Sequence, residues 1–222
     1  MTQPSFAPDA IFFDMDGLLV DTEPYWLETE RDLMAEFGVV WKHEDQLHCL
    51  GGPMEKVGRY MASLADHQQS CDWFAEELIS RIARKFQEIS LMPGVSELLL
   101  DVANRRLPSA LVSASPRILV DAVLSSISNH PFQLSVSAND IERGKPHPDP
   151  YLKAARELGV KIENSLILED SPTGVAAARS SGAWVIAVPQ ITTVSEGSKS
   201  AIIKSLHGHS IDSLWELVGA KY

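Results

Sequence analysis

The sequence predicts an α/β fold in which helices cover a parallel β-sheet and an all-helical domain is inserted after the first strand. Two observations carry this prediction. Short β-rich apolar runs alternate with stretches of helical periodicity, as in proteins built from βαβ units. One long stretch, residues 22–89, has apolar residues at helical spacing and no convincing strand. A chain of 222 residues can bury one good core with a small second unit.

Five apolar runs are expected to form the strands of the sheet. They cover residues 10–13, 109–112, 134–137, 165–168 and 183–188. Continuous apolar runs of this kind are typical of parallel strands that helices bury on both faces. Residues 190–200, rich in Ser and Thr, are expected to form a surface loop instead.

Two helices between these strands carry end signals. Asp149 is expected to cap a helix over residues 151–158. Pro150 suits the first helical position, and Gly159 suits the stop. A second helix is expected over about residues 173–181, and it ends at the following glycine in the same way.

The segment from Thr22 to about Ile89 is expected to be a helical domain of its own. It is far longer than an ordinary βα connection. Pro93-Gly94 marks the return of the chain to the sheet. The expected domains are a sheet-containing core, residues 1–21 and 91–222, and an inserted helical domain, residues 22–90.

Charge argues against two classes of partner. The formal net charge is −11, and the longest basic runs are pairs such as Arg84-Lys85 and Arg105-Arg106. Phosphate backbones and anionic lipids are repelled by such a surface. We therefore expect neither nucleic acid nor a membrane as a partner, but a small molecule.

The sequence also predicts a cytoplasmic location. Cys49 and Cys71 form no CxxC pattern and are too few for a disulfide framework, so two free thiols are expected. The first residues lack the charged and apolar regions of a signal peptide. No apolar run approaches the roughly 20 residues that span a bilayer.

Candidate functional residues follow the predicted strands. Ligands of open parallel sheets bind beyond the carboxyl ends of the strands. Four carboxylates, one hydroxyl and one amine are expected there or in adjoining loops: Asp14, Asp16, Glu169, Asp170, Ser113 and Lys145. We interpret Ser115 only as a turn residue before Pro116.

These residue types predict phosphoryl chemistry at a metal site. Converging carboxylates repel one another by about 4 kcal/mol per close pair at an effective dielectric constant of 20, so the cluster needs a cation. A set of carboxylates without His or Cys suits Mg²⁺. One carboxylate can act as a nucleophile, and a second, two residues on, as general acid and base. Ser113 and Lys145 can hold a phosphoryl group.

A family resemblance rests on four motifs in order. The run IFFDMDGLLVDT, residues 11–22, resembles the first motif of the haloacid dehalogenase (HAD) superfamily of phosphohydrolases. The second, third and fourth motifs are matched by Ser113, by Lys145 and by Glu169-Asp170. The resemblance implies a Rossmann-like doubly wound parallel sheet with an all-α cap domain of type 1.

The resemblance also implies roles for single residues. Asp14 is expected to be the nucleophile and Asp16 the acid and base. The phosphate-binding residues are expected to be Ser113, Ala114 and Lys145. The metal site is expected to use Asp14, the carbonyl of Asp16, Asp170 directly and Glu169 through water.

Within the superfamily, Asp16 favours phosphate esters over other substrates. Dehalogenases resemble DxY and phosphonate-cleaving members DxA at this place, whereas a carboxylic acid suits protonation of an alcohol leaving group. β-Phosphoglucomutase shares the DxDG, SAS, KP and ED motifs, but Trp26 and Met54 stand where it has a cap histidine and arginine. The stretch from Asp16 to Trp26, which includes Glu23-Pro24-Tyr25-Trp26, resembles bacterial 2-deoxyglucose-6-phosphate and hexitol-phosphate phosphatases.

The expected function is therefore Mg²⁺-dependent hydrolysis of a small sugar or polyol phosphate through an aspartyl-phosphate. The alternatives are a sugar phosphomutase and a non-catalytic phosphometabolite-binding protein. Substrate selection is assigned to Trp26, Gly51 and Met54, and the chain is expected to be a monomer or weak homodimer. A zinc site at His43, His48 and Cys49 is the less favoured interpretation of the cap polar residues.

Overall fold

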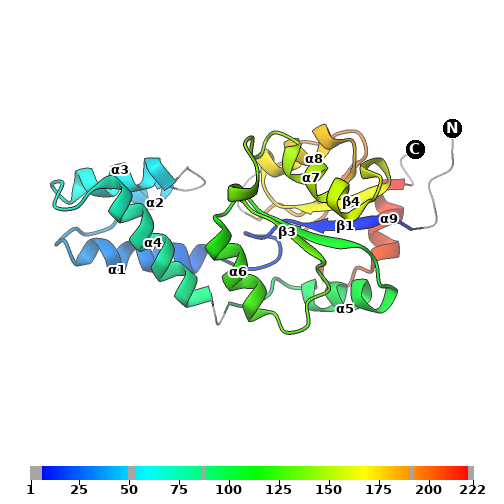
Figure 1. Cartoon of the computed structure of the whole chain (residues 1–222), viewed down its shortest axis with the longest axis horizontal. Coiled ribbons are helices and arrows are strands. Elements are labelled where there is room, and N and C mark those ends of the chain that lie inside the picture. The colour runs from blue at the N-terminus through cyan, green and yellow to red at the C-terminus, as the bar shows by residue number, and fades with distance from the viewer. Residues whose placement is uncertain (1–6, 50–53, 87–88, 191–192, 220–222) are drawn as a thin grey trace. The chain divides into compact units, whose positions relative to one another are not determined.

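The computed structural model describes residues 7–49, 54–86, 89–190 and 193–219. The chain divides into two compact units. We call the first the core unit, which comprises Met1–Asp21, Ser90–Val120 and Ile127–Tyr222. The second, the helical unit, comprises Thr22–Ile89 and Asp121–Ser126. Figure 1 labels most of the elements of both units.

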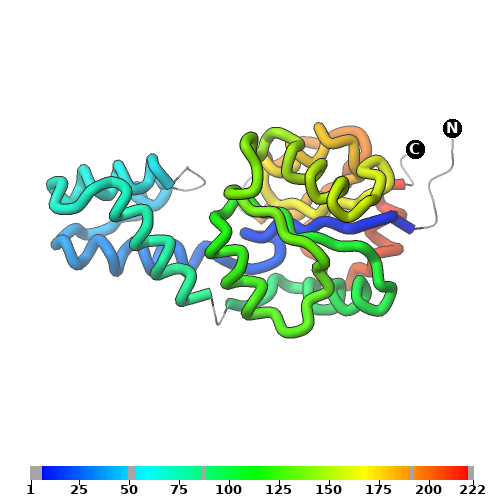
Figure 2. The backbone as a smooth tube through the Cα atoms, viewed as in Figure 1, coloured from blue at the N-terminus to red at the C-terminus, as the bar shows by residue number. Residues whose placement is uncertain are grey.

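The core unit contains a parallel sheet of six strands in the order β3-β2-β1-β4-β5-β6. This order is the doubly wound one, so the predicted fold class is confirmed. The blue β1 lies beside the green β2 and the yellow β4 in Figure 2. The strands are β1 (Ala10–Phe13), β2 (Ser109–Val112), β3 (Leu134–Val136), β4 (Ser165–Glu169), β5 (Trp184–Ala187) and β6 (Ser200–Ile202).

Helices on both faces bury the central strands. β1 is fully buried, and its Phe12 lies between Ala110 and Ile167 of the neighbouring strands. The cluster around Phe12 includes apolar residues of α7 (Asp149–Leu158) and α8 (Pro172–Ser181). The other helices of the core unit are α5 (Val95–Arg105), α6 (Arg117–Ser126, shared with the helical unit) and α9 (Ile211–Gly219). Two short 3₁₀ turns cover Ala138–Asp140 and Ile162–Asn164.

Two details of the core differ from the prediction. Ser200, expected at the end of a loop, begins β6, an edge strand too short to leave a pattern in the sequence. Helix α7 begins at Asp149 itself rather than after it. The Asp149 carboxylate accepts two hydrogen bonds from Arg143, at 2.8 and 3.1 Å, and so does not cap the helix. The predicted stop at Gly159 is confirmed, with φ at +69°.

The helical unit contains four helices among its described residues, apart from the end of α6. They are α1 (Glu23–Ala35), α2 (His43–Cys49), α3 (Met54–Leu64) and α4 (Cys71–Lys85). In α4, Phe74, Leu78 and Ile82 recur every four residues and are all buried. The Ser70 hydroxyl caps this helix by accepting a hydrogen bond from Trp73 N at 3.1 Å.

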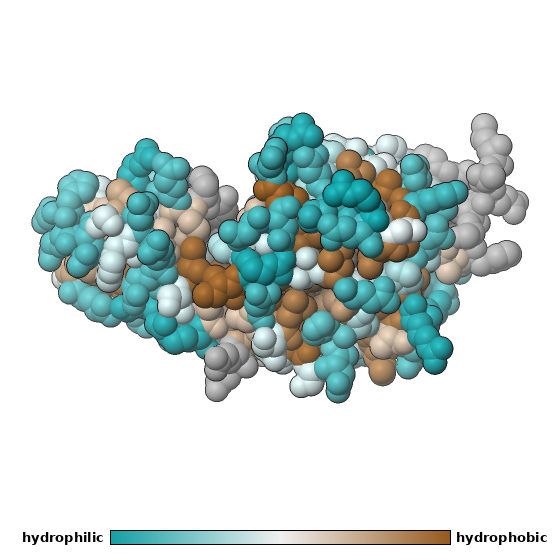
Figure 3. Space-filling view, viewed as in Figure 1, coloured by the Kyte–Doolittle hydropathy of each residue, from teal (hydrophilic) through white to brown (hydrophobic). Residues whose placement is uncertain are grey.

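The face of the molecule shown in Figure 3 is largely hydrophilic, with brown apolar areas between the polar residues. This agrees with the strongly acidic composition. Within the described part of the chain, we find no helix that is both long and apolar enough to cross a membrane.

Candidate active site

Three acidic side chains converge where β1 and β4 end. The backbone N–H of Asp14 donates to the carbonyl of Leu168 at 3.0 Å, which continues the pairing of the two strands by one residue. Each of Asp14, Glu169 and Asp170 offers an oxygen within 4.8 Å of the others. The neighbouring strand ends thus bring together three of the four carboxylates singled out in the sequence.

Lys145, in the loop before α7, contacts two carboxylates of this cluster through its ammonium group. Its ammonium donates to the Asp14 carboxylate, to Glu169 Oε1 at 2.6 Å and to the carbonyl of Val112 at 2.9 Å. Only 5% of the side chain is exposed. Burial lowers the pKa of Lys145, but the charges of Asp14 and Glu169 outweigh it and raise that pKa above its usual value. Lys145 is therefore a fixed positive charge beside the nucleophile candidate.

Glu169 is fully buried and held by protein donors on both oxygens. The Tyr151 hydroxyl donates to Oε1 at 2.6 Å, alongside Lys145. Oε2 accepts the N–H of Asp170 at 3.2 Å and the Ser171 hydroxyl at 3.3 Å. With these partners, Glu169 fixes Lys145 in place. Tyr151 was not predicted as a site residue, because a tyrosine on an apolar helix face gives no signal of its own in the sequence.

A glycine lets the turn after β1 approach Asp170. Gly17 has φ at +80°, and a Cβ added there would lie 2.4 Å from Asp170 Oδ2. Burial and the charge of Glu169 raise the pKa of Asp170 to about 7, and the same two causes raise the pKa of Asp14 well above its usual value. Without a further cation the cluster therefore resists full ionisation.

The fourth carboxylate, Asp16, is held by the loop that follows β2. The hydroxyls of Ser113 and Ser115 both donate to Asp16 Oδ2, at 3.3 and 2.8 Å. The loop itself is fixed because Ser113 N donates to Val136 O at 2.9 Å. The interpretation of Ser115 as a turn residue alone is therefore incomplete. Its spacing of two residues from Ser113 is the sequence signal that could have found it.

Four candidates from the sequence remain: Ala114, Trp26, Met54 and Gly51. Ala114 lies exposed between the two serines. Trp26 on α1 and Met54 on α3 belong to the helical unit, and both are partly exposed. Gly51 lies outside the described residues.

The less favoured zinc site finds no support among the described residues. The one group of His, Cys, Asp and Glu there with metal-binding spacing is Asp14, Glu169 and Asp170. The His48 ring instead stacks on Tyr60, with centroids 4.2 Å apart. Cys49 is buried, which raises the pKa of its thiol to about 12.

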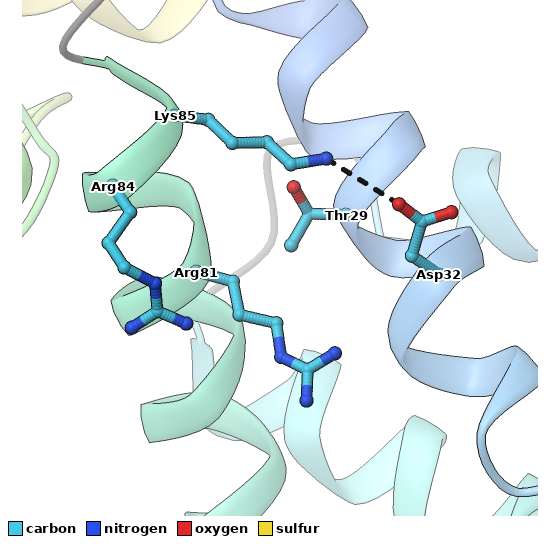
Figure 4. Close-up of a pocket in the computed structure, with 5 residues that line it drawn as sticks. All are labelled: Thr29, Asp32, Arg81, Arg84 and Lys85. Atoms are coloured by element: carbon cyan, nitrogen blue, oxygen red, sulfur yellow. Dashed lines mark ion pairs between the residues drawn. The ribbon is translucent and has the colours of Figure 1, made fainter.

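The helical unit has a pocket of about 300 Å³ between α1 and α4, lined by Thr29, Asp32, Arg81, Arg84 and Lys85 (Figure 4). Its cations already have partners. Lys85 pairs with Glu28 at 2.9 Å and with Asp32 at 3.6 Å. Arg81 pairs with Glu77 at 2.7 Å and also binds Glu36. Arg84 donates to the Ser80 hydroxyl at 2.8 Å, so each cation that lines the pocket has a protein partner and the pocket is not a candidate anion site.

Comparison with known proteins identifies the family. A model of haloacid dehalogenase-like hydrolases matches residues 11–188. Hexitol phosphatase B of Escherichia coli (strain K12) is 34% identical over 184 residues, which cover 81% of this chain and 83% of that protein. A probable pseudouridine-5'-phosphatase of Drosophila melanogaster is 32% identical over 185 residues, 80% of each chain.

Solved structures support the same conclusion. The crystal structure of a CbbY variant from Rhodobacter sphaeroides in complex with xylulose-1,5-bisphosphate aligns with a TM-score of 0.78 and 25% identity, over 93% of this chain and 99% of that chain. A putative β-phosphoglucomutase from Thermotoga maritima aligns with a TM-score of 0.73 and 25% identity, over 96% and 97%. The relatives named by function above include phosphatases, which agrees with the predicted enzyme class. This chain belongs to the haloacid dehalogenase-like hydrolase family.

Proposed function

We propose that the chain is a Mg²⁺-dependent phosphomonoester hydrolase that acts on a small sugar or polyol phosphate through an aspartyl-phosphate on Asp14. The observation that carries this proposal is the pairing of two carboxylates in different environments. Asp14 is buried against Lys145, whereas Asp16, two residues on, is held by serine hydroxyls. Such a difference suits a nucleophile and a separate acid and base.

The residues present fit a magnesium ion. The donor set consists of carboxylates, and Gly17 leaves room beside Asp170 Oδ2 that a Cβ would fill. Asp14, Asp170 and the Asp16 carbonyl are the proposed direct ligands. Glu169 is proposed to act through water, since both its oxygens already have protein donors. Bound Mg²⁺ offsets the charge of the carboxylates and of the phosphoryl group.

The chain's own residues account for both proton and phosphoryl transfer. An Asp14 oxygen forms a bond to phosphorus while the bond from phosphorus to the ester oxygen breaks. Protonated Asp16 gives its proton to the departing oxygen, which leaves as the alcohol. Ionised Asp16 then takes a proton from water as the water oxygen attacks phosphorus, which releases phosphate and regenerates Asp14. Ser113, Ala114 and Lys145 hold the phosphoryl oxygens.

The sugar or polyol part of the proposal rests on the relatives. Hexitol phosphatase B and a phosphorylated carbohydrates phosphatase of Thermotoga maritima, 30% identical over 176 residues, are both similar to this chain. We assign substrate selection to the inserted domain, residues 22–90, with Trp26, Gly51 and Met54 as candidates. The proposed enzyme is a cytoplasmic monomer or weak homodimer that takes neither nucleic acid nor a membrane as partner.

A panel of sugar, polyol and nucleoside phosphates tests the proposal by release of inorganic phosphate. We expect release with Mg²⁺, none with excess EDTA, and a severe loss of Mg²⁺-dependent activity in Asp170→Ala. Full activity in EDTA would contradict the metal assignment. No release from any ester, with phosphorylated compounds still bound, would favour the non-catalytic alternative.

A sugar phosphomutase is the second candidate, because putative β-phosphoglucomutases are among the similar structures. The same panel separates the two activities. Interconversion of glucose phosphates without net release of phosphate identifies a mutase, whereas a hydrolase releases phosphate from the start.

A further inference from the structure

Asp16 is tied to two hydroxyls through a single oxygen. Ser115 Oγ donates to Asp16 Oδ2 at 2.8 Å, and Ser113 Oγ donates to the same atom at 3.3 Å. A hydroxyl has one hydrogen to donate. Both serine hydroxyls therefore direct their hydrogens to Asp16 Oδ2 in this arrangement.

The two serines are not equivalent. Ser113 Oγ also accepts the backbone N–H of Ser115 at 2.9 Å, and its contact with Asp16 is the longer one. In the proposed function Ser113 turns its hydroxyl to the phosphoryl group. The shorter bond, from Ser115, then remains as the one that holds Asp16.

The backbone around Ser115 is fixed from two sides. The carbonyl of Ser115 accepts the N–H of Ala138 at 3.0 Å, which ties this loop to the end of β3. Two residues on, the N–H of Arg117 donates to Asn139 Oδ1 at 2.9 Å. A hydroxyl on so constrained a loop holds its acceptor in one place, and such support from a neighbouring residue keeps a reacting group in its productive geometry.

We infer that Ser115 is a positioning residue that orients the carboxyl group of Asp16, the acid and base. The inference rests on the proposed function, in which Asp16 protonates the leaving alcohol. The Asp16 carboxyl passes its proton to the ester oxygen as the bond to phosphorus breaks, and Asp16 takes a proton back from water in the second step.

This role predicts a dependence on the leaving group. An alkyl alkoxide needs its proton as it leaves, whereas an activated aryl oxide needs little protonation. In Ser115→Ala, kcat for an alkyl sugar phosphate should fall about tenfold or more, and kcat for an aryl phosphate by less than about threefold. KM should change little for either ester, and Ser115→Thr, which keeps the hydroxyl, should restore most of the alkyl rate.

A matched control is available on α6. The Ser125 hydroxyl is exposed and donates to the Asp121 carbonyl at 2.7 Å, far from the acidic cluster in the sequence. Ser125→Ala should change neither rate. Equal losses on both esters, or a rise in KM without a fall in kcat, would show that Ser115 binds substrate or only supports the loop. Either result overturns the inference.

A stability measurement separates this inference from the proposed function. The urea midpoints of unfolding are compared for Ser115→Ala, Asp16→Ala and the double variant, without metal. If Ser115 and Asp16 are hydrogen-bonded, the urea midpoint of the double variant should shift by clearly less than the sum of the shifts in the two single variants. If the wild type hydrolyses no ester, the proposed function fails on its own. Additive shifts contradict the hydrogen bond, whatever the activity.

Discussion

At the scale of single residues, the site depends on the close approach of backbone segments to the acidic side chains. Gly17 lies against Asp170, and Gly174 lies against Glu169, where an added Cβ would meet the carboxylate at 1.9 Å. Two of the three acidic residues of the cluster, Asp170 and Glu169, thus face a glycine that leaves them room. Glycines, which have no side chain to bind a ligand, therefore help to define the geometry of the candidate metal site.

Gly17→Ala should weaken metal binding. The new Cβ meets Asp170 Oδ2 and sits at a positive φ, so Asp170 must shift. We expect the Mg²⁺ concentration for half-maximal activity to rise about tenfold, or ~1.4 kcal/mol. Gly38→Ala is the control, because Gly38 has φ at +73° but nothing within 4 Å of the added Cβ. An equal rise in both variants would assign the effect to backbone strain alone.

Substitutions of the two aspartates of the first motif should reduce activity in different ways. Asp14→Asn removes the nucleophile, so it should be inert on every ester. Asp16→Asn removes the acid and base, and it should retain more of its rate on an activated aryl phosphate than on an alkyl sugar phosphate. Initial rates on the two ester types measure this. Equal losses in both variants on both esters would contradict the division of roles.

At the scale of elements, the helical unit contains a buried acid that the chemistry does not use. Glu30 on α1 is 5% exposed, and its Oε2 accepts the indole N–H of Trp41 at 3.2 Å. Burial raises the pKa of Glu30 from 4.5 to about 7, although the Trp41 bond lowers it. The native state therefore binds this proton more tightly than the unfolded chain does.

The sign of this shift gives a pH-dependent prediction. The contribution of Glu30 to stability is full below about pH 4.5 and is lost as pH rises through 7. Glu30→Gln keeps an acceptor for Trp41 and should raise the free energy of unfolding at about pH 8 by ~2 kcal/mol, with little change at low pH. Urea unfolding at several pH values measures this effect.

Glu28→Gln is the control for that measurement. Glu28 lies on the same helix but pairs with Lys85, whose hydrogen bond lowers the pKa of Glu28. Its removal should not stabilise the protein above neutral pH. If Glu28→Gln raises stability as much as Glu30→Gln does, the gain comes from reduced negative charge on α1 and not from the buried carboxylate.

The proposed selection of substrates also belongs to a group of elements, the inserted helical domain. The motifs of the core unit serve groups common to all phosphate esters, so discrimination must come from other residues. Trp26→Ala or Met54→Ala should change the ranking of sugar phosphates by about tenfold, or ~1.4 kcal/mol, and scarcely change turnover of a small aryl phosphate. Values of kcat/KM over the panel test this. An unchanged ranking with folded variants would place the selecting contacts elsewhere.

At the scale of the whole molecule, the sheet and the four loops that carry the candidate site residues could be predicted because parallel strands are buried on both faces. Phe12 and Ile167 are apolar for that reason, and the polar residues after them stand out. β6 could not be predicted, since an edge strand of three residues has no such pattern. Tyr151 and Ser115 were missed as partners because their roles depend on contacts with Glu169 and Asp16 from distant parts of the chain.

In the proposed mechanism, Asp14 carries the phosphoryl group as a covalent intermediate. This role is tested by quenching a single turnover with acid, using a radiolabelled phosphate ester and Mg²⁺, and mapping the label on the digested chain. We predict label on the peptide that contains Asp14, its loss on treatment with hydroxylamine, and none in Asp14→Asn. Rapid release of phosphate by the wild type with no protein-bound label at any time, or label retained in Asp14→Asn, would contradict the claim.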